Sequence, residues 1–160
     1  MLRLKKINRE NVWNILKLEV SDDQKSFVAT NGISIIEAYT AITENGYAFP
    51  FAIYEDDIPV GFLMIGYDAD DYWYDAPKIA KGNYNLWRLM IDKNYQGKGL
   101  GKEAIRLALE FINTFPCGIG EYCWLSYEAE NDIARQLYSS FGFVETGEKD
   151  GEELIAVLKL

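Results

Sequence analysis

The chain has no histidine and only two cysteines, Cys117 and Cys123. The absence of imidazole excludes the Ser-His-Asp and Cys-His schemes of nucleophilic catalysis, so proton transfer must use tyrosine, a carboxylate, lysine, cysteine, a chain terminus or water. The two cysteines do not have C-x-x-C spacing, and a zinc ion would have to draw its ligands from Asp and Glu. We therefore expect no metal site.

Long hydrophobic runs are missing as well. The apolar stretches fall far short of the roughly 20 residues needed to cross a bilayer. The segment from Met1 to Ile7 alternates like a strand and lacks an apolar core of signal-peptide length. We expect a cytoplasmic protein without a membrane partner.

Basic residues are scarce, because 16 Lys and Arg stand against 25 Asp and Glu, which gives a net charge of −9. Nucleic acid is disfavoured as a partner, since a phosphate-binding surface should be basic. The acidic field favours small cationic molecules instead. The alternative is that the charge only keeps the protein in solution.

What the chain does contain indicates one domain, residues 1–160. Apolar residues make up 49% of the sequence, and a chain of this length buries about 68–70% of its unfolded surface. Periodicity and turn signals predict strands at 2–7, 48–54, 59–67, 83–91, 121–126, 143–146 and 154–158, and helices at 8–20, 34–44, 99–115 and 131–140. This order predicts an α/β (α+β) fold with a mixed, largely antiparallel sheet flanked by helices.

The most informative segment is the glycine-rich turn Gln96–Gly101, which follows an apolar run at 86–91 and opens an amphipathic helix. The first N–H groups of a helix have no internal partner, and the helix dipole adds partial positive charge there, so the turn suits a pyrophosphate. The P-loop pattern fails because Gln96 and Glu103 occupy its two ends, and the dinucleotide pattern fails at Lys102. The alternative is a helix cap with spare glycines.

Together with a second segment, this turn resembles the acyl-CoA loop of the GNAT acetyltransferase superfamily. Residues 95–101 read Y-Q-G-K-G-L-G, and residues 131–143 read N-D-I-A-R-Q-L-Y-S-S-F-G-F, similar to the family's N-x-x-A-x-x-L/F-Y-x-x-x-G-F. The resemblance covers residues 2–158. It implies the GNAT fold of about seven strands, with central strands splayed apart to admit acetyl-CoA, and N-acetyltransferase activity.

The resemblance also implies the cofactor site. Main-chain groups on the strand would pair with the pantetheine arm and stabilise the oxyanion, and the turn would hold the pyrophosphate; the residues are Leu89, Met90, Ile91, Gln96, Gly97, Lys98, Gly99, Leu100, Gly101 and Lys102. Tyr138 would contact the cofactor and protonate the departing thiolate, since a phenol with an ordinary pKa of about 10 is protonated at neutral pH. The alternative for Tyr138 is a core aromatic. Asn131 is a helix cap, a pantetheine contact, or both.

The general base stays open at this point. Related polyamine acetyltransferases place an acidic residue on the strand before the glycine loop, but residues 85–88 here are Asn, Leu, Trp and Arg. Substitutes by position are Glu19, Asp22, Asp23 and Glu128, and proton loss through water is an equal alternative. The segment 18–23 resembles the acceptor side of bacterial spermine/spermidine acetyltransferases, which assigns Glu19, Asp22 and Asp23 to substrate binding.

The acceptor is expected to be a small cationic amine. Residues 67–75 interleave four carboxylates with four aromatics, and salt bridges plus cation–π attraction of about 0.5–2 kcal/mol would suit a polycation, with Asp70 and Trp73 as candidates. The alternative is a loop packed at a subunit contact. Spermidine or spermine is the expected acceptor, attacked directly in a ternary complex; an aminoglycoside, an amino acid, a peptide N-terminus, or a non-catalytic acyl-CoA sensor are the alternatives. The resemblance suggests a homodimer.

Overall fold

The computed structural model describes every residue from Met1 to Leu160. Its strands are β1 (Leu2–Lys6), β2 (Tyr47–Glu55), β3 (Ile58–Tyr67), β4 (Tyr84–Ile91), β5 (Tyr122–Tyr127), β6 (Val144–Asp150) and β7 (Glu153–Lys159). Its helices are α1 (Val12–Leu16), α2 (Asn31–Thr43), α3 (Leu100–Ile112) and α4 (Asp132–Ser139). The strands form one sheet in the order β1-β2-β3-β4-β5-β7-β6, in which only β4 and β5 run parallel. The predicted fold class is confirmed.

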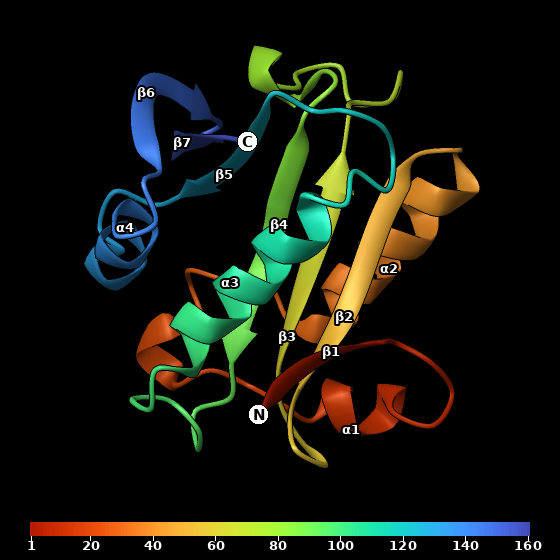
Figure 1. Cartoon of the computed structure of the whole chain (residues 1–160), viewed down its shortest axis with the longest axis vertical. Helices are drawn as coiled ribbons and strands as arrows, with labels where there is room; N and C mark the ends of the chain where they lie inside the picture. Colours follow the sequence, from red (N-terminus) through yellow and green to blue (C-terminus); the bar gives the residue numbers. More distant parts are fainter.

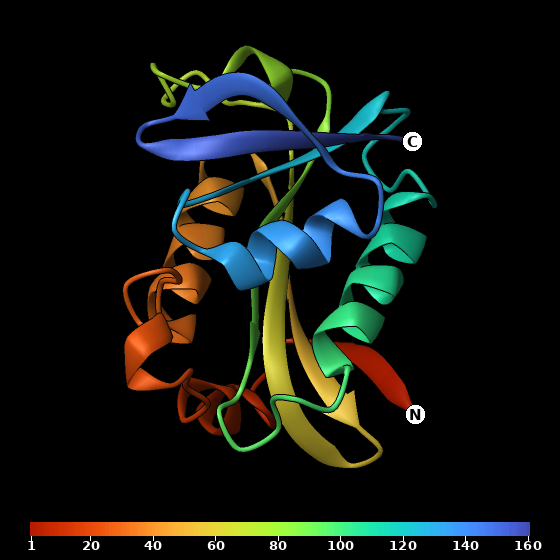
Figure 2. The same cartoon turned by 90° about the vertical axis from the view of Figure 1, so that its left-hand side faces the viewer.

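Both faces of the sheet are covered by helices, and the alternation of side chains along the strands shows why. Phe51 and Leu63 belong to the core cluster that includes the buried stripe of α3. Their neighbours Ala52 and Phe62 belong to the cluster that includes α1 and α2 residues. Because successive strand residues point to opposite faces, β2 and β3 are apolar on both sides. Figure 2 shows α2 and α3 on opposite sides of these strands.

The first helix is much shorter than expected. The sequence predicted a helix from Asn8 to about Val20, whereas α1 spans only Val12–Leu16. The chain leaves the helix because long-range hydrogen bonds capture Glu19: its N–H donates to a carboxylate oxygen of Asp92 at 3.0 Å, and its C=O accepts from the N–H of Lys93 at 2.9 Å. Tertiary contacts thus override the local helical pattern.

The other boundaries differ less. Helix α2 begins three residues before the predicted start, because the Thr30 hydroxyl caps it by accepting from the N–H of Ile33. Helix α3 ends at Ile112, and Phe115 adopts a positive φ of 51°. No helix has the length and hydrophobicity that crossing a bilayer requires.

The sheet opens between β4 and β5. Only Tyr84 and Asn85 of β4 pair with β5, opposite Cys123 and Trp124. Beyond this point the two strands diverge (Figure 1), and the rest of β4 has no strand on its β5 side. Alternate residues of an edge strand leave their N–H and C=O groups unpaired. The predicted splay of the central strands is therefore present.

Candidate active site

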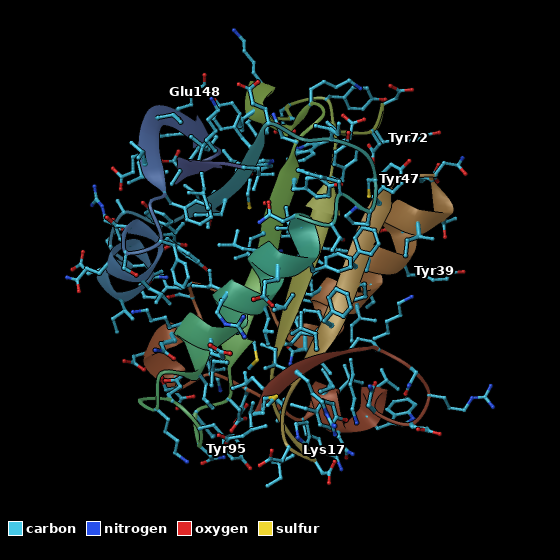
Figure 3. The ribbon with its side chains drawn as sticks, in the orientation of Figure 1. Lys17, Tyr39, Tyr47, Tyr72, Tyr95 and Glu148 are labelled. Atoms are coloured by element: carbon cyan, nitrogen blue, oxygen red, sulfur yellow. The ribbon has the colours of Figure 1, made fainter.

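The main cavity of the molecule occupies the opening between β4 and β5 and has a volume of about 1670 Å³. It is long: Tyr95 and Tyr72 both line it, and Figure 3 shows them at opposite ends of the molecule. The cavity touches both faces of the sheet, since its lining includes members of the α3-side core cluster as well as members of the α2-side cluster. Its lining divides into two parts of different chemistry.

The first part is the glycine-turn half, formed by Leu89, Ile91, residues 95–102 except Lys98, Asn131, Leu137 and Tyr138. Gly97 and Gly99 have φ values of 79° and 78°, a left-handed conformation that side chains rarely adopt. A Cβ at either position would meet no atom within 4 Å. Glycine is therefore required here by backbone conformation rather than by crowding within the chain.

The turn presents bare main-chain donors. Gly99 is the N-cap of α3 and supplies no side-chain cap, and the first hydrogen bond of the helix runs from the N–H of Glu103 to the C=O of Gly99. The N–H groups of Leu100, Gly101 and Lys102 therefore precede the helical ladder. With the positive end of the helix dipole behind them, they form an anion-binding position. The chain fits a pyrophosphate at this place.

Side chains on either side hold the turn in position. The amide of Gln96 donates to the C=O of Ile91 at 2.9 Å and to the Gln24 amide oxygen at 2.8 Å. Asp92, only 4% exposed, accepts from the N–H groups of Glu19 and Asn94. The sequence motif indicated Gln96 but gave no signal for Asp92. Both tie the end of β4 to the segment after α1.

The predicted lysines behave differently from each other. Lys102 lines the cavity. Lys98 does not line it, is exposed, and lies over the Tyr95 ring at 5.6 Å. The prediction that Lys98 contacts the pyrophosphate therefore gains no support from its placement.

Tyr138 lies where α4 faces the opening. It lines the cavity and stacks on Tyr127, with ring centroids 6.1 Å apart, and meets Phe143 edge-on at 5.8 Å. Burial, followed by the nearby Cys123 thiol, raises the pKa of the Tyr138 phenol above its ordinary value. The proton thus stays on the phenol throughout the neutral range, as a general acid requires.

Asn131 shows that a residue can have two roles. Its side chain caps α4 by accepting from the N–H of Ala134 at 3.3 Å. It also lines the cavity. The capping reading is confirmed, and the pantetheine contact stays a prediction.

The second part of the cavity is the carboxylate half, on the side of α2 and the C-terminal hairpin. Its polar and aromatic lining comes from segments far apart in sequence and includes Glu37, Asp70, Trp73, Arg88, Trp124, Glu128, Asp150 and Glu153. Asp70 and Trp73 were predicted, and both line the cavity. Asp70 also shapes its own loop, because it accepts from the N–H groups of Tyr72 and Trp73.

Arg88 faces the carboxylate half because of a bulge in β4. Arg88 pairs with Met64 and Leu86 with Ile65, so Trp87 is an extra residue in β4. Trp87 consequently packs against the α2-side cluster, and Arg88, its neighbour in sequence, pairs with Glu37 of α2 at 3.2 Å. The Arg88 Nε–H is buried without a partner. Arg88 therefore places a positive charge on the strand that precedes the glycine-rich turn.

The acidic side chains of the segment after α1 do not line the cavity. Glu19, Asp22 and Asp23 do not line it. Glu19 pairs with Lys93 at 2.6 Å, Asp22 pairs with Lys25 at 2.8 Å, and the Ser21 hydroxyl donates to Asp23. These contacts stabilise the segment, so their placement lends no support to the assignment of the three acids as substrate ligands. Among the substitute bases, only Glu128 lines the cavity.

Several residues of the carboxylate half were not predicted as parts of a site. Glu37, Asp150 and Glu153 carried no motif, and their approach depends on how α2, β6 and β7 are arranged. The sequence showed only that residues 85–88 lack a carboxylate, and it gave no role to the charge of Arg88. Trp124 was predicted only as one residue of the strand at 121–126. No signal within the sequence indicated that these side chains would meet.

The chain also matches known proteins in sequence. The family described as "Acetyltransferase (GNAT) family" matches residues 9–143. The chain is 32% identical to the probable spermine N(1)-acetyltransferase of Bacillus subtilis subsp. natto (strain BEST195), over 96% of both chains. It is 31% identical to the spermine/spermidine N(1)-acetyltransferase of Bacillus subtilis (strain 168), again over 96% of both.

Solved structures share the fold at low identity. The aminoglycoside acetyltransferase AAC(6')-Ib in complex with coenzyme A has a TM-score of 0.77 at 14% identity, covering 99% of this chain and 95% of the other. The PaiA N-acetyltransferase of Thermoplasma acidophilum, also in complex with coenzyme A, has a TM-score of 0.68 at 15% identity, covering 100% and 99%.

Proposed function

Because the chain belongs to the GNAT acetyltransferase family, we propose that it transfers the acetyl group of acetyl-CoA to a primary amine of spermidine or spermine. The observation that carries the proposal is the long cavity between β4 and β5, which joins an anion-binding turn to a half rich in carboxylates. The first part suits the diphosphate of an acyl carrier, and the second suits a polycation. The names of the two Bacillus relatives support the choice of amine.

The residues of the glycine-turn half would bind and orient acetyl-CoA. The N–H groups at the start of α3 would hold its diphosphate, with Lys102 beside them. The unpaired edge of β4 from Leu89 to Ile91 would pair with the pantetheine arm as an added strand does. An N–H on this edge would stabilise negative charge that develops on the acetyl oxygen. Acetyl-CoA supplies the thioester that the amine attacks.

Tyr138 would donate the proton that the departing thiolate needs. Its raised pKa keeps the phenol protonated, and its stacking on Tyr127 fixes the ring at the opening of the sheet. The attacking amine must lose a proton first. Glu128 is the one substitute base that lines the cavity, and a water relay through the carboxylate half is the alternative.

An amine panel tests the proposed function. The purified chain and acetyl-CoA are incubated with spermidine, spermine, simple monoamines, an aminoglycoside, an amino acid and a peptide, and CoA release is measured. We expect a higher kcat/KM for spermidine or spermine than for the other amines. Higher efficiency with the aminoglycoside or peptide would move the substrate assignment to that amine. Binding of acetyl-CoA without turnover of any amine would favour a sensor.

The proposed working unit is a homodimer of single-domain chains in the cytoplasm, where metabolic acetyl-CoA is available. Apolar side chains exposed along α2 would suit a subunit contact: Ile33, Ile36, Tyr39 and Ile42, between 51% and 72% exposed. Figure 3 shows Tyr39 on the outer side of α2. Light scattering after gel filtration measures the mass, and a monomer at micromolar concentration would contradict this part of the proposal.

A further inference from the structure

Three carboxylates of the carboxylate half come from one corner of the molecule. Glu128 follows β5, Asp150 ends β6, and Glu153 begins β7 directly opposite Asp150. All three are half-buried and line the main cavity. None of them forms an ion pair, in contrast to Glu37, which Arg88 neutralises.

Neighbouring carboxylates disfavour the ionised forms of Asp150 and Glu153. Burial raises the pKa of Asp150, and Asp75 raises it further. Burial also raises the pKa of Glu153, with further contributions from Asp150 and Glu128 that Arg88 partly offsets. Half-buried carboxylates that no ion pair neutralises are unfavourable for the folded chain alone. A cation in the cavity would remove this cost.

Trp124 gives a second and independent sign of a ligand. The side chain is only 2% exposed and lines the same cavity, and its indole N–H has no hydrogen-bond partner. Trp124 shares one face of β5 with Ser126, opposite Val157 and Ile155 of β7, and Glu153 continues that face. Buried donors are nearly always paired, so this N–H points to a group that enters the cavity.

We infer that Glu128, Asp150, Glu153 and Trp124 form a subsite for the far end of the acceptor, meaning a charged nitrogen other than the one that is acetylated. The inference rests on the proposed function and extends it to specificity. The carboxylates would accept hydrogen bonds from the ammonium group. The Trp124 indole would donate to a water that hydrates the ammonium group, because an ammonium nitrogen has no lone pair. Trp73, stacked on Trp124 at 6.1 Å, would cover the subsite.

The subsite predicts that polyamine preference resides in KM. The Glu153→Gln variant is compared with the wild-type protein at saturating acetyl-CoA, using spermidine and a simple monoamine. Loss of one charge contact should raise KM for spermidine about tenfold, equivalent to about 1.4 kcal/mol, while kcat stays within about twofold and KM for the monoamine is unchanged. An unchanged KM for spermidine, or an equal rise for both amines, would overturn the subsite.

A matched control and a second variant separate charge from packing. Glu148→Gln removes a carboxylate from the outer strand β6 (Figure 3), outside the main cavity, and should leave both amines unaffected. Trp124→Phe keeps an aromatic ring but removes the indole donor, and we expect KM for spermidine to rise about threefold to fivefold. An unchanged KM for spermidine in Trp124→Phe would remove the indole from the subsite.

The failure of the subsite and the failure of the proposed function can be told apart. If the wild type acetylates no polyamine, the function proposal fails, and calorimetry with 1,4-diaminobutane and the CoA-loaded protein tests the subsite directly. Weaker binding of this diamine to Glu153→Gln than to wild type would support the subsite. Equal binding, or no binding to the wild type, would overturn it.

Discussion

The two halves of the cavity are built in different ways. The glycine-turn half uses main-chain groups from continuous stretches of the chain: the end of β4, the turn at 96–99 and the first residues of α3. The carboxylate half uses side chains from α2, the loop after β3, β4, β5 and the C-terminal hairpin. Backbone geometry would thus hold acetyl-CoA, whereas side chains that substitution can alter would hold the amine.

This difference predicts which changes are tolerated. A main-chain donor is lost only when the backbone moves. Substitutions in the glycine-turn half should therefore weaken acetyl-CoA binding by changing the backbone conformation. The carboxylate half depends on charge, so isosteric amide substitutions should change its preference without unfolding the protein. Loss of the Tyr138 proton donor should reduce the rate more than either kind of change.

The largest effect is expected at Tyr138, the proposed proton donor in the glycine-turn half. Tyr138→Phe keeps the stacking on Tyr127 but removes the phenolic proton donor, and we expect kcat to fall about 100-fold, the lower range for a lost general acid. Steady-state kinetics with a saturating amine measures it. Tyr122→Phe is the control, because Tyr122 begins β5 but lies outside the main cavity. An unaltered kcat in Tyr138→Phe would refute the acid role.

The next effect concerns the glycine-turn half. Gly99→Ala forces a side chain into a left-handed conformation, at a cost of about 1–2 kcal/mol, and should raise KM for acetyl-CoA about tenfold as the turn shifts. Gly147→Ala is a matched control, because Gly147 has a φ of 86° and equally open surroundings but lies on β6. We expect similar thermal destabilisation from both and a changed KM only from Gly99→Ala. Equal KM values would contradict a binding role for the turn.

In the carboxylate half, removing the charge of Glu37 and removing that of Arg88 should shift KM for spermidine in opposite directions. Glu37→Gln leaves the Arg88 charge unneutralised in the cavity and should raise KM for spermidine about fivefold. Arg88→Gln leaves Glu37 free and should lower KM for spermidine by a similar factor. A fivefold change corresponds to about 1 kcal/mol, the size expected for two charges some distance apart in a partly hydrated site. The pair is part-buried, with side chains 24% and 34% exposed. Changes of the same sign in both variants would show a structural effect of breaking the pair.

The smallest effect concerns stability. The raised pKa of Asp150 means that the folded state binds its proton more tightly than the unfolded state, so its contribution to stability falls as pH rises through the carboxyl range. Asp150→Asn removes this cost and should raise Tm by about 1–2 °C at pH 7.5, with the gain disappearing by about pH 3, where the carboxyl is protonated in both states. Differential scanning fluorimetry measures it, with Glu148→Gln as control. A lower Tm at pH 7.5 would contradict the burial of an uncompensated charge at Asp150.

The same contrast explains what the sequence could predict. The turn at 96–101 and the Tyr138 segment carry local patterns, and the structure brings both to the cavity. The strands β2 and β3 also followed from their apolar runs, since most of their residues are buried on one face of the sheet or the other. The chemistry predicted for the turn and for Tyr138 stays a prediction, which the Gly99 and Tyr138 variants test.

The carboxylate half escaped prediction for a physical reason. Glu37 and Arg88 are 51 positions apart, and their contact needs both the bulge at Trp87 and the placement of α2. Glu19 and Asp22 were assigned to substrate from a local resemblance, but neighbouring lysines at 25 and 93 pair with them instead. The helix expected at 8–20 failed likewise, because Asp92 binds the main chain at Glu19. Long-range pairing of charges leaves no periodic trace in one sequence.

The narrow join between β4 and β5 has a consequence for motion. Two residue pairs connect the N-terminal part of the sheet to the unit of β5, β6 and β7, so these blocks are joined more weakly than any other neighbours in the sheet. A pantetheine chain lying along β4 would add the missing rung and link α3 to α4. The amides between 86 and 91 that face away from β3 should then exchange with deuterium quickly in the free protein and slowly once the acyl carrier is present, so that loading would stiffen the enzyme as well as supply its reactant.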